Sequence, residues 1–303
     1  MTVKKAWPVI FFGSEENSLL VLKRIATFPF LKVTAVVTPP PQPQGRKRII
    51  TPTPVHLWAQ EQSIKVFSPP SITNEIIKAI KKEKPQLGIL AAYGKIIPSS
   101  LIKIFPKGII NIHPSLLPQW RGPTPVETAL LSGAQKTGVS LFLLDEKIDH
   151  GPLLVQKRIK ISPQDNQLTL SQQLFNQGAA LLKQHLKAYL QGQIKPSPQN
   201  HHQATYTRKL SRQDGFINSE DLQKALRGSP QAIEIERKIR ALYPWPGTYT
   251  LVGHPSPKRL KILKARLSKD KKLILTQIQL EGKQPLSSPQ SIKPLLKRFS
   301  LLS

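Results

Sequence analysis

An amide, an imidazole and a hydroxyl group follow one another along a short segment of the chain. Asn111, His113 and Ser115 alternate within Asn-Ile-His-Pro-Ser-Leu-Leu-Pro, directly after an apolar run. Alternate residues of an extended segment point to the same side, so Asn111 and His113 share one side of the chain. An asparagine amide is a neutral donor that can bind an oxygen on which negative charge develops. The segment is therefore a candidate site for acyl chemistry.

A carboxylate, Asp149, stands 38 positions after Asn111 and closes another apolar run. A carboxylate near an imidazole can fix its protonation and accept a proton through water. Asn111, His113 and Asp149 together suit the attack of an amine on an acyl carbon without a covalent intermediate. Each residue alone reads as an ordinary loop or turn residue, so the combination carries the prediction. Ser115 is a rival nucleophile, but the Gly-x-Ser-x-Gly pattern of a nucleophile elbow is missing.

The residues up to Ile112 predict the sheet that positions this site. Short apolar runs alternate with amphipathic segments at residues 18–26 and 72–82, as in a doubly wound α/β domain with a parallel sheet. The apolar runs are Val9–Phe12, Val33–Val37, Leu87–Ala91 and Ile109–Ile112. Such sheets bind ligands at the carboxyl ends of their strands, and Asn111 closes one of these strands.

The following residues predict a framework around the Asp149 loop. Thr124-Pro-Val-Glu127 has a capping-box pattern with proline at the first helical position, and it predicts a short helix through Leu131. We expect strands at 137–144 and 153–161, a long helix at 168–190 and a linker at 195–203. His201 and His202 in that linker lack the further ligands that a metal site needs.

The pattern changes after Tyr206. We expect helices at 219–226 and 232–241, then strands at 248–252, 259–267 and 273–280, while residues 286–303 have no clear pattern. Helices followed by short strands indicate a small barrel or sandwich.

Charge and cysteine content narrow the function classes. The formal net charge is +28, and residues 201–303 alone carry 20 Lys and Arg against 7 Asp and Glu. Such an excess favours a polyanionic partner over a merely solvated basic surface. The absence of cysteine excludes disulfides, a thiol nucleophile and thiolate metal sites, and it is compatible with the cytoplasm. We read the apolar run after the two N-terminal lysines as a first strand rather than a signal peptide, and we find no apolar run of about 18 residues that could cross a membrane.

At these residues the chain resembles the formyltransferases that use 10-formyltetrahydrofolate, whose hallmark is Asn-x-His-x-Ser-Leu-Leu-Pro followed by Asp-x-Gly. Further segments resemble one branch of that family, the methionyl-tRNA formyltransferases. These segments are Trp120-Arg-Gly122, Ala92–Pro98, Tyr206–Leu210 and Tyr243–Pro246. The resemblance covers roughly residues 7–280. It departs from the family at Gly13-Ser-Glu-Glu16, where Gly-Thr-Pro is usual, and after Gly282.

The resemblance implies a folate co-substrate and a set of roles for the site. Asn111 would bind the formyl oxygen, His113 would assist and Asp149 would manage protons, with no metal involved. The folate pocket would be lined by Ala91, Ala92, Tyr93, Gly94, Ser115, Leu116, Leu117 and Pro118. The Leu117-Pro118 peptide bond is a candidate for the cis form.

The resemblance also implies that initiator methionyl-tRNA is the acceptor. The proline-rich segment 39–54 resembles the family's tRNA-contacting insertion, with Arg46, Lys47 and Arg48 at its tip to bind phosphate and Ile49 and Ile50 to press on the acceptor end. Its alternative is a solvated basic loop. Two other functions stay open: formylation of a small amine, such as glycinamide ribonucleotide or an amino-sugar nucleotide, and RNA binding without catalysis.

These features together predict two domains. We expect a doubly wound, Rossmann-like catalytic domain at 1–190, a linker at 191–205 and a basic, β-rich domain with an OB-like barrel at 206–303 that holds tRNA. We also expect a monomer in the cytoplasm, without membrane association.

Overall fold

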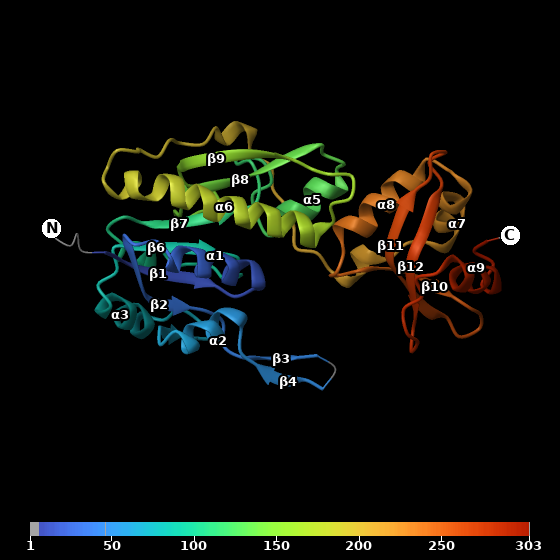
Figure 1. The fold of residues 1–303 in the computed structure, drawn as a ribbon, viewed down its shortest axis with the longest axis horizontal. Coiled ribbons are helices and arrows are strands. Elements are labelled where there is room, and N and C mark those ends of the chain that lie inside the picture. Colours follow the sequence, from blue (N-terminus) through green and yellow to red (C-terminus); the bar gives the residue numbers. More distant parts are fainter. Residues whose placement is uncertain (1–5, 46, 303) are drawn as a thin grey trace. The chain divides into compact units, whose positions relative to one another are not determined.

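The computed structural model describes residues 6–45 and 47–302, and the described chain forms two compact units (Figure 1). The first unit consists of the chain up to Pro123, Lys136–Lys160 and Ser171–Tyr206. The second consists of Thr124–Gln135, Ile161–Leu170 and the chain from Thr207 onward. Each unit therefore combines segments that lie far apart in the sequence.

A seven-stranded sheet forms the centre of the first unit, in the order β5-β2-β1-β6-β7-β8-β9. Its strands are β1 (Trp7–Gly13), β2 (Leu31–Val37), β5 (Lys65–Phe67), β6 (Leu87–Ala91), β7 (Ile109–His113), β8 (Lys136–Leu143) and β9 (Leu153–Lys160). The chain enters at β1 in the middle, builds one side of the sheet and then crosses to β6 on the other side. This is the doubly wound arrangement that the sequence predicts.

The sheet is mixed rather than fully parallel. Strands β5, β2, β1, β6 and β7 run parallel, whereas β8 pairs antiparallel with β7 and β9 pairs antiparallel with β8. A parallel pair needs a crossover of about a dozen or more residues. Only residues 144–152 join β8 to β9, so these two strands form a hairpin, with Asp149 in its loop.

Helices cover both faces of this sheet, because its central strands are apolar on both sides. Ile10 and Phe12 of β1 pack in a cluster with Ile80 and Leu101 from two helices of the first unit. Helix α6 packs on β8 and β9 through Leu182 and its neighbours, and Figure 1 shows it running along these strands. The helices of the first unit are α1 (Glu16–Ala26), α2 (Pro54–Glu61), α3 (Asn74–Lys82), α4 (Ser99–Ile102) and, from Ser171 onward, α6 (Gln167–Leu190), whereas α5 (Pro125–Leu131) belongs to the second unit.

The proline-rich segment after β2 forms a small hairpin. Strand β3 (Gln42–Gln44) pairs antiparallel with β4 (Ile49–Thr51), and Gly45 adopts a φ of 68° at the turn. The pair stands apart from the main sheet, so Pro43 does not interrupt a longer ladder. Figure 1 shows the hairpin extending away from the sheet.

The second unit contains a three-stranded antiparallel sheet in the order β10-β11-β12, with helices packed on it. Its elements are α7 (Ser219–Arg227), α8 (Gln231–Ala241), β10 (Thr248–Val252), β11 (Lys258–Leu267), β12 (Leu273–Leu280) and α9 (Pro289–Arg298). Leu222, Ile239, Leu260 and Ile278 are buried in its core. The helices and strands expected between 219 and 280 are confirmed, and closure into an OB-like barrel stays a prediction.

The short helix α5 begins as predicted but is capped differently. Thr124 is the N-cap and Pro125 the first helical residue, but the Thr124 side chain makes no capping hydrogen bond. Its hydroxyl instead donates to the carbonyl oxygen of Arg208 at 2.9 Å. A tertiary hydrogen bond within the second unit thus replaces the local one that the sequence pattern suggests.

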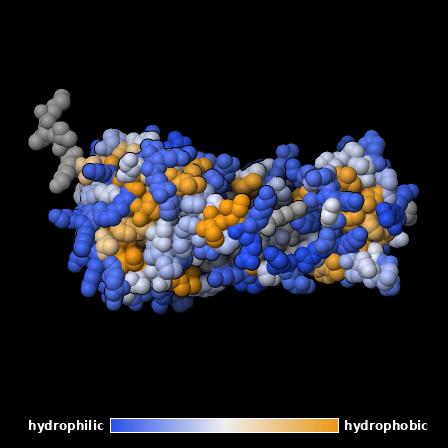
Figure 2. Space-filling model, turned by 90° about the horizontal axis from the view of Figure 1, so that it is seen from below, coloured by the Kyte–Doolittle hydropathy of each residue, from blue (hydrophilic) through white to orange (hydrophobic). Residues whose placement is uncertain are grey.

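Two further observations concern membranes and surface. Among the described residues, no helix has both the length and the apolar character needed to cross a bilayer. Figure 2 shows one face of the molecule, on which hydrophilic side chains dominate and hydrophobic ones gather in separate groups. A mostly hydrophilic face is expected of a chain whose formal net charge is +28.

Gly138 of β8 offers a test of how the sheet holds the Asn111 segment. A methyl group at this position would meet the carbonyl oxygen of Lys157 and the side chain of Leu116. We expect Gly138→Ala to destabilise the protein by roughly 1–3 kcal/mol, as overpacking usually does. Thermal unfolding measures this, with Lys136→Ala on the exposed end of the same strand as the control. Equal unfolding temperatures for both variants would contradict the close packing.

Candidate active site

Strand β7 carries the first two residues of the site. Asn111 and His113 are both buried, with 8% and 4% of their surfaces exposed. They stand two residues apart on a strand that lies between β6 and β8, so they share one face. The Oδ1 atom of Asn111 is buried and has no hydrogen-bond partner among the described residues. A buried amide with a free polar atom is expensive unless a ligand satisfies it.

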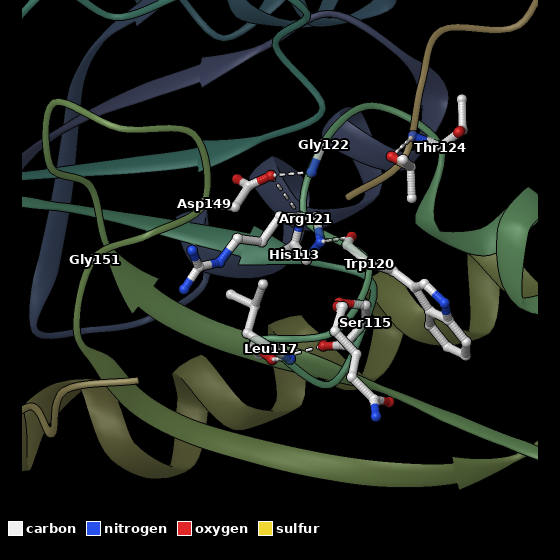
Figure 3. Close-up of polar contacts among 12 residues, drawn as sticks. His113, Ser115, Leu117, Trp120, Arg121, Gly122, Thr124, Asp149 and Gly151 are labelled. Atoms are coloured by element: carbon white, nitrogen blue, oxygen red, sulfur yellow. Dashed lines mark hydrogen bonds and ion pairs between the residues drawn. The ribbon is translucent and has the colours of Figure 1, made fainter. Parts of the chain in front are cut away.

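Asp149 reaches the same place from the loop between β8 and β9. Its Oδ2 atom accepts a hydrogen bond from the Gly122 N–H at 2.7 Å and lies 3.7 Å from Nδ1 of His113. In Figure 3 the carboxylate points toward both groups. The backbone of Asp149 has a φ of 47°, a left-handed conformation that is costly for a residue with a side chain. The loop begins beside the start of β7, where Leu143 pairs with Ile110, and it folds back so that the Asp149 carboxylate meets His113.

The orientation of the His113 ring fixes its tautomer. Its Nε2 atom lies 2.9 Å from the carbonyl oxygen of Trp120, which can only accept, so Nε2 carries a hydrogen. Nδ1 is then the atom that faces Asp149. At 3.7 Å the two groups are too far apart for a direct hydrogen bond but within the distance of an ion pair.

Ser115 has a structural role within the loop after β7. Its hydroxyl is fully buried and donates to the carbonyl oxygen of Gln119 at 2.6 Å, which closes the turn. The hydroxyl therefore has no basic partner of the kind that activates a nucleophile. The geometry gives no support to the alternative of a serine hydrolase.

Two polar residues that the sequence analysis did not select hold the loop through Pro118. The Ser140 hydroxyl donates to the Ser115 carbonyl oxygen at 2.6 Å and accepts from the Leu117 N–H at 3.1 Å. The Gln156 amide donates to the Leu117 carbonyl oxygen at 2.8 Å. The Leu117-Pro118 peptide bond is cis, as predicted.

The segment after β6 forms a second turn beside the end of β7. The carbonyl oxygen of Ala91 accepts from the Ser18 hydroxyl at 2.6 Å, and that of Ala92 accepts from the Ser14 hydroxyl at 2.7 Å. Ser14 stands where the family pattern has threonine, and its hydroxyl contacts this turn. Gly94 has a φ of 76° and open space where a side chain would stand.

Gly13 serves packing rather than phosphate binding. A methyl group there would lie 2.6 Å from the side chains of Phe11 and Ser18, so only glycine fits between β1 and α1. This explains the glycine without the spaced glycine pattern of a dinucleotide site.

Arg121 connects the site to the segment expected to be a linker. Its side chain is buried, and its guanidinium donates to Gln199 Oε1 at 2.7 Å, to Nδ1 of His201 at 2.8 Å and to the Tyr206 hydroxyl at 3.1 Å. Residues 199–206 therefore form an ordered part of the first unit. No periodic pattern marks them in the sequence, since their order comes from contacts with Arg121.

His201 has a role other than metal binding. Its ring stacks on His150 at 3.9 Å between centroids, and burial together with nearby positive charge lowers its pKa. Among residues 6–45 and 47–302 no group of three potential metal ligands of the His, Cys, Asp or Glu types occurs.

The basic residues at the tip of the β3–β4 hairpin form a second candidate region, apart from Asn111, His113 and Asp149. Lys47, Arg48, Ile49 and Ile50 are exposed on the β3–β4 hairpin, while Arg46 lies outside the described residues. The two isoleucines are 61% and 62% exposed, which is unusual for such apolar side chains.

The fold and the site define a group-transfer enzyme with a doubly wound domain and an acyl-transfer site at the strand ends. The family model "Formyl transferase" matches residues 9–186, and "Formyl transferase, C-terminal domain" matches residues 229–273. The chain belongs to the formyl transferase family.

Curated relatives are similar over most of this chain. A protein named methionyl-tRNA formyltransferase from Chloroflexus aurantiacus is 38% identical over 262 residues, which are 86% of this chain and 80% of that protein. A protein of the same name from Kosmotoga olearia is 37% identical over 81% of this chain and 76% of its own length.

Solved structures share the fold at lower identity. A 4-N formyltransferase from Francisella tularensis has a TM-score of 0.63 at 16% identity, covering 84% of this chain and 96% of that one. An N-formyltransferase from Helicobacter canadensis, in complex with folinic acid and dTDP-3-aminofucose, has a TM-score of 0.61 at 22% identity, covering 87% and 88%. These likenesses support the fold class.

The buried phenol of Tyr93 makes the stability of the protein depend on pH in the alkaline range. Burial raises the pKa of Tyr93 to about 12, and its hydroxyl has no partner among the described residues. An unfolded chain ionises tyrosine near pH 10, so stability is intact below that pH and falls as the pH rises toward 12. Phenylalanine does not ionise, so we expect the Tyr93→Phe variant to lose less unfolding free energy than the wild-type protein. The difference at pH 11 is up to about 1.4 kcal/mol.

Urea unfolding at pH 8 and pH 11 measures the difference, with Tyr249→Phe as a control for the loss of a phenol. A wild-type protein and a Tyr93→Phe variant that lose stability in parallel would refute the assignment.

Proposed function

We propose that this protein transfers the formyl group of 10-formyltetrahydrofolate to the amino group of methionine on initiator methionyl-tRNA. One observation carries the proposal: relatives named methionyl-tRNA formyltransferase are 37–38% identical over most of the chain, well beyond the catalytic motif. Translation initiation takes place in the cytoplasm, so the proposal places the protein there. We further propose that it acts as a monomer.

The residues at the strand ends fit a folate co-substrate. The backbone of Ala91–Gly94 and the loop Ser115–Pro118 would line the pocket, and Gly94 leaves open space beside it. The buried Oδ1 atom of Asn111 accepts no hydrogen bond from the described residues, so it remains available to a donor group of a bound ligand. When bound, the folate would supply a formyl carbon that is open to attack by an amine.

Three side chains then divide the work. The Asn111 amide would donate to the formyl oxygen as negative charge grows on it. Asp149 would take up a proton from the attacking amine, directly or through water, while the Gly122 N–H holds its carboxylate. His113, whose Nδ1 faces that carboxylate, would hold the proton or help to pass it to the folate nitrogen that leaves when its bond to the formyl carbon breaks.

Contacts with tRNA would lie outside the catalytic cluster. Lys47 and Arg48 are exposed at the hairpin tip and would bind phosphate, together with Arg46. Residues 206–303 would act as the tRNA-binding domain, joined by 191–205 to a catalytic domain at 1–190. The charge of that region would supply affinity that does not depend on sequence, and the catalytic site would supply positioning.

The two rival functions have weaker support. Two solved structures of the same fold are named sugar formyltransferases, but they are at most 20% identical to this chain. Neither an amino-sugar nucleotide nor glycinamide ribonucleotide requires a strongly basic second unit. RNA binding alone would not require Asn111, His113 and Asp149 to meet.

Comparing acceptors tests the proposed function. We expect the purified protein to formylate methionyl initiator tRNA from 10-formyltetrahydrofolate, and to leave glycinamide ribonucleotide and amino-sugar nucleotides unmodified. Asp149→Asn and Asn111→Ala should each lower kcat by at least about 100-fold, because one removes the proton acceptor and the other the oxygen's donor. Circular dichroism and thermal unfolding check that both variants fold. Unchanged turnover in both variants would rule out these roles.

Neutralising the hairpin tests the RNA contacts. Changing Arg46, Lys47 and Arg48 to glutamine should raise KM for tRNA and reduce the slope of log KM against log salt by about two to three, since each phosphate contact releases counterions. Folate binding should stay unchanged. The matched control changes Lys78, Lys81 and Lys82 on helix α3, which alters net charge equally. If both triple variants behave alike, the hairpin has no special role.

A further inference from the structure

One buried amide contacts two backbone carbonyl groups of the Asp149 loop. Gln199 is only 5% exposed, and its Nε2 atom donates to the carbonyl oxygens of Asp149 at 3.0 Å and Gly151 at 2.7 Å. Its Oε1 atom accepts two hydrogen bonds from Arg121, from Nη2 at 2.7 Å and from Nε at 3.3 Å. Both donors and both acceptor positions of the amide are therefore in use.

The loop needs such support because its backbone is strained. Asp149 has a φ of 47°, and a non-glycine residue in this region costs of order 1–3 kcal/mol unless its surroundings impose it. Two residues on, Gly151 packs so tightly that a methyl group would meet the carbonyl oxygen of Leu143. The Gln199 amide thus holds the loop on one side, and the end of β8 holds it on the other. The carboxylate therefore keeps its direction toward His113.

Arg121 determines the orientation of the Gln199 amide. Its guanidinium can only donate, so it must face Oε1, and this leaves Nε2 toward the two carbonyl oxygens. Arg121 itself is 1% exposed and is fixed by the Tyr206 hydroxyl and by His201. The next residue, Gly122, donates its N–H to the Asp149 carboxylate. Backbone and side chain of Asp149 are thus held by neighbouring parts of one network.

We infer that Gln199 is a positioning residue for the reaction: its amide sets the backbone of the Asp149 loop and thereby the distance between the Asp149 carboxylate and His113. The inference rests on the proposed function for the identity of the reaction. Gln199 acts through Asp149, and its own amide is occupied by the protein.

The decisive variant is Gln199→Glu. Glutamate keeps the shape and the acceptor for Arg121, but it replaces both N–H donors with an oxygen that faces two carbonyl oxygens. We expect kcat for methionyl-tRNA to fall by roughly 10- to 100-fold, since a misplacement of about 1 Å can cost that much. KM values for tRNA and folate should stay within about threefold, because neither substrate contacts this amide. Gln203→Glu is the matched control, with the same charge change at an exposed position of the same segment.

A double-mutant cycle separates positioning from general structure. If Gln199 acts only through Asp149, adding Gln199→Glu to Asp149→Asn should cause little further loss of kcat. Losses that multiply in the double variant, or a rise in KM with kcat unchanged, would overturn the inference. Should Gln199→Glu lower the unfolding temperature markedly, Gln199→Met removes the N–H donors without a new charge but also the acceptor for Arg121, so kcat of both variants is compared at a temperature at which each is fully folded.

A measurement without turnover keeps this test independent of the proposed function. The imidazole NMR signals of His113, assigned with a His113→Ala variant, should shift in Gln199→Glu and remain in place in Gln203→Glu. A wild-type protein that formylates no methionyl-tRNA would refute the proposed function, and the NMR result would still decide the role of Gln199. Unshifted His113 signals would refute the positioning role even in an active enzyme.

Discussion

The site depends on the burial of one cation. The Arg121 side chain is 1% exposed, and a guanidinium taken out of water costs several kcal/mol unless hydrogen bonds replace its hydration. Its partners among the described contacts, Gln199, His201 and Tyr206, all come from one stretch of chain about 80 positions later. That stretch must therefore lie across the loop after β7. Once it does, Gln199 is in place against the Asp149 loop, so a structural requirement of the cation also orders the carboxylate.

The sheet supplies the other half of the arrangement. Parallel strands β6 and β7 end side by side, which places the Ala91–Gly94 turn next to Asn111 and His113. The end of β8 lies at the other edge, because β8 runs antiparallel to β7 and its Leu143 pairs with Ile110 near the start of that strand. The loop 144–152 therefore turns back toward His113 and brings the Asp149 carboxylate within 3.7 Å of the imidazole. Contacts with distant segments hold this return, among them those of the Gly122 N–H and the Gln199 amide.

The hydrophobic pattern of the sequence predicts most of this fold. The residue types and their spacing predict Asn111, His113 and Asp149 as the central residues of the site. Strands β6, β10 and β12 have the bounds that the sequence indicates, because each is an apolar or alternating run between turn residues. Strand direction is not contained in such a pattern. The short connection between β8 and β9 indicates a hairpin, but nothing local indicates that β8 pairs antiparallel with β7. Helix α9 was missed because Pro294 lies inside it and weakens any helical signal.

Gln199 was missed for a different physical reason. A segment rich in proline, asparagine and histidine has the composition of a linker, and nothing local distinguishes it from a disordered one. Its order comes from contacts with residues far away in the sequence. The Thr124 hydroxyl illustrates the same principle, since it bonds to Arg208 rather than to its own helix. Sequence patterns report local preferences, whereas a positioning network is a tertiary property.

The choice of acceptor has a different origin from the chemistry. Asn111, His113 and Asp149 provide one amide, one imidazole and one carboxylate, a set that can serve any primary amine held near a formyl carbon. None of the three side chains can sense whether that amine belongs to a sugar or to an aminoacylated RNA. Selection must therefore come from surfaces that contact the remainder of the acceptor, and a polyanion is the acceptor for which exposed basic residues help most. The positive charge of this chain is greatest after residue 200, outside the catalytic motif. Under the proposed function, catalysis and recognition are thus assigned to different residues, and either can change while the other is kept.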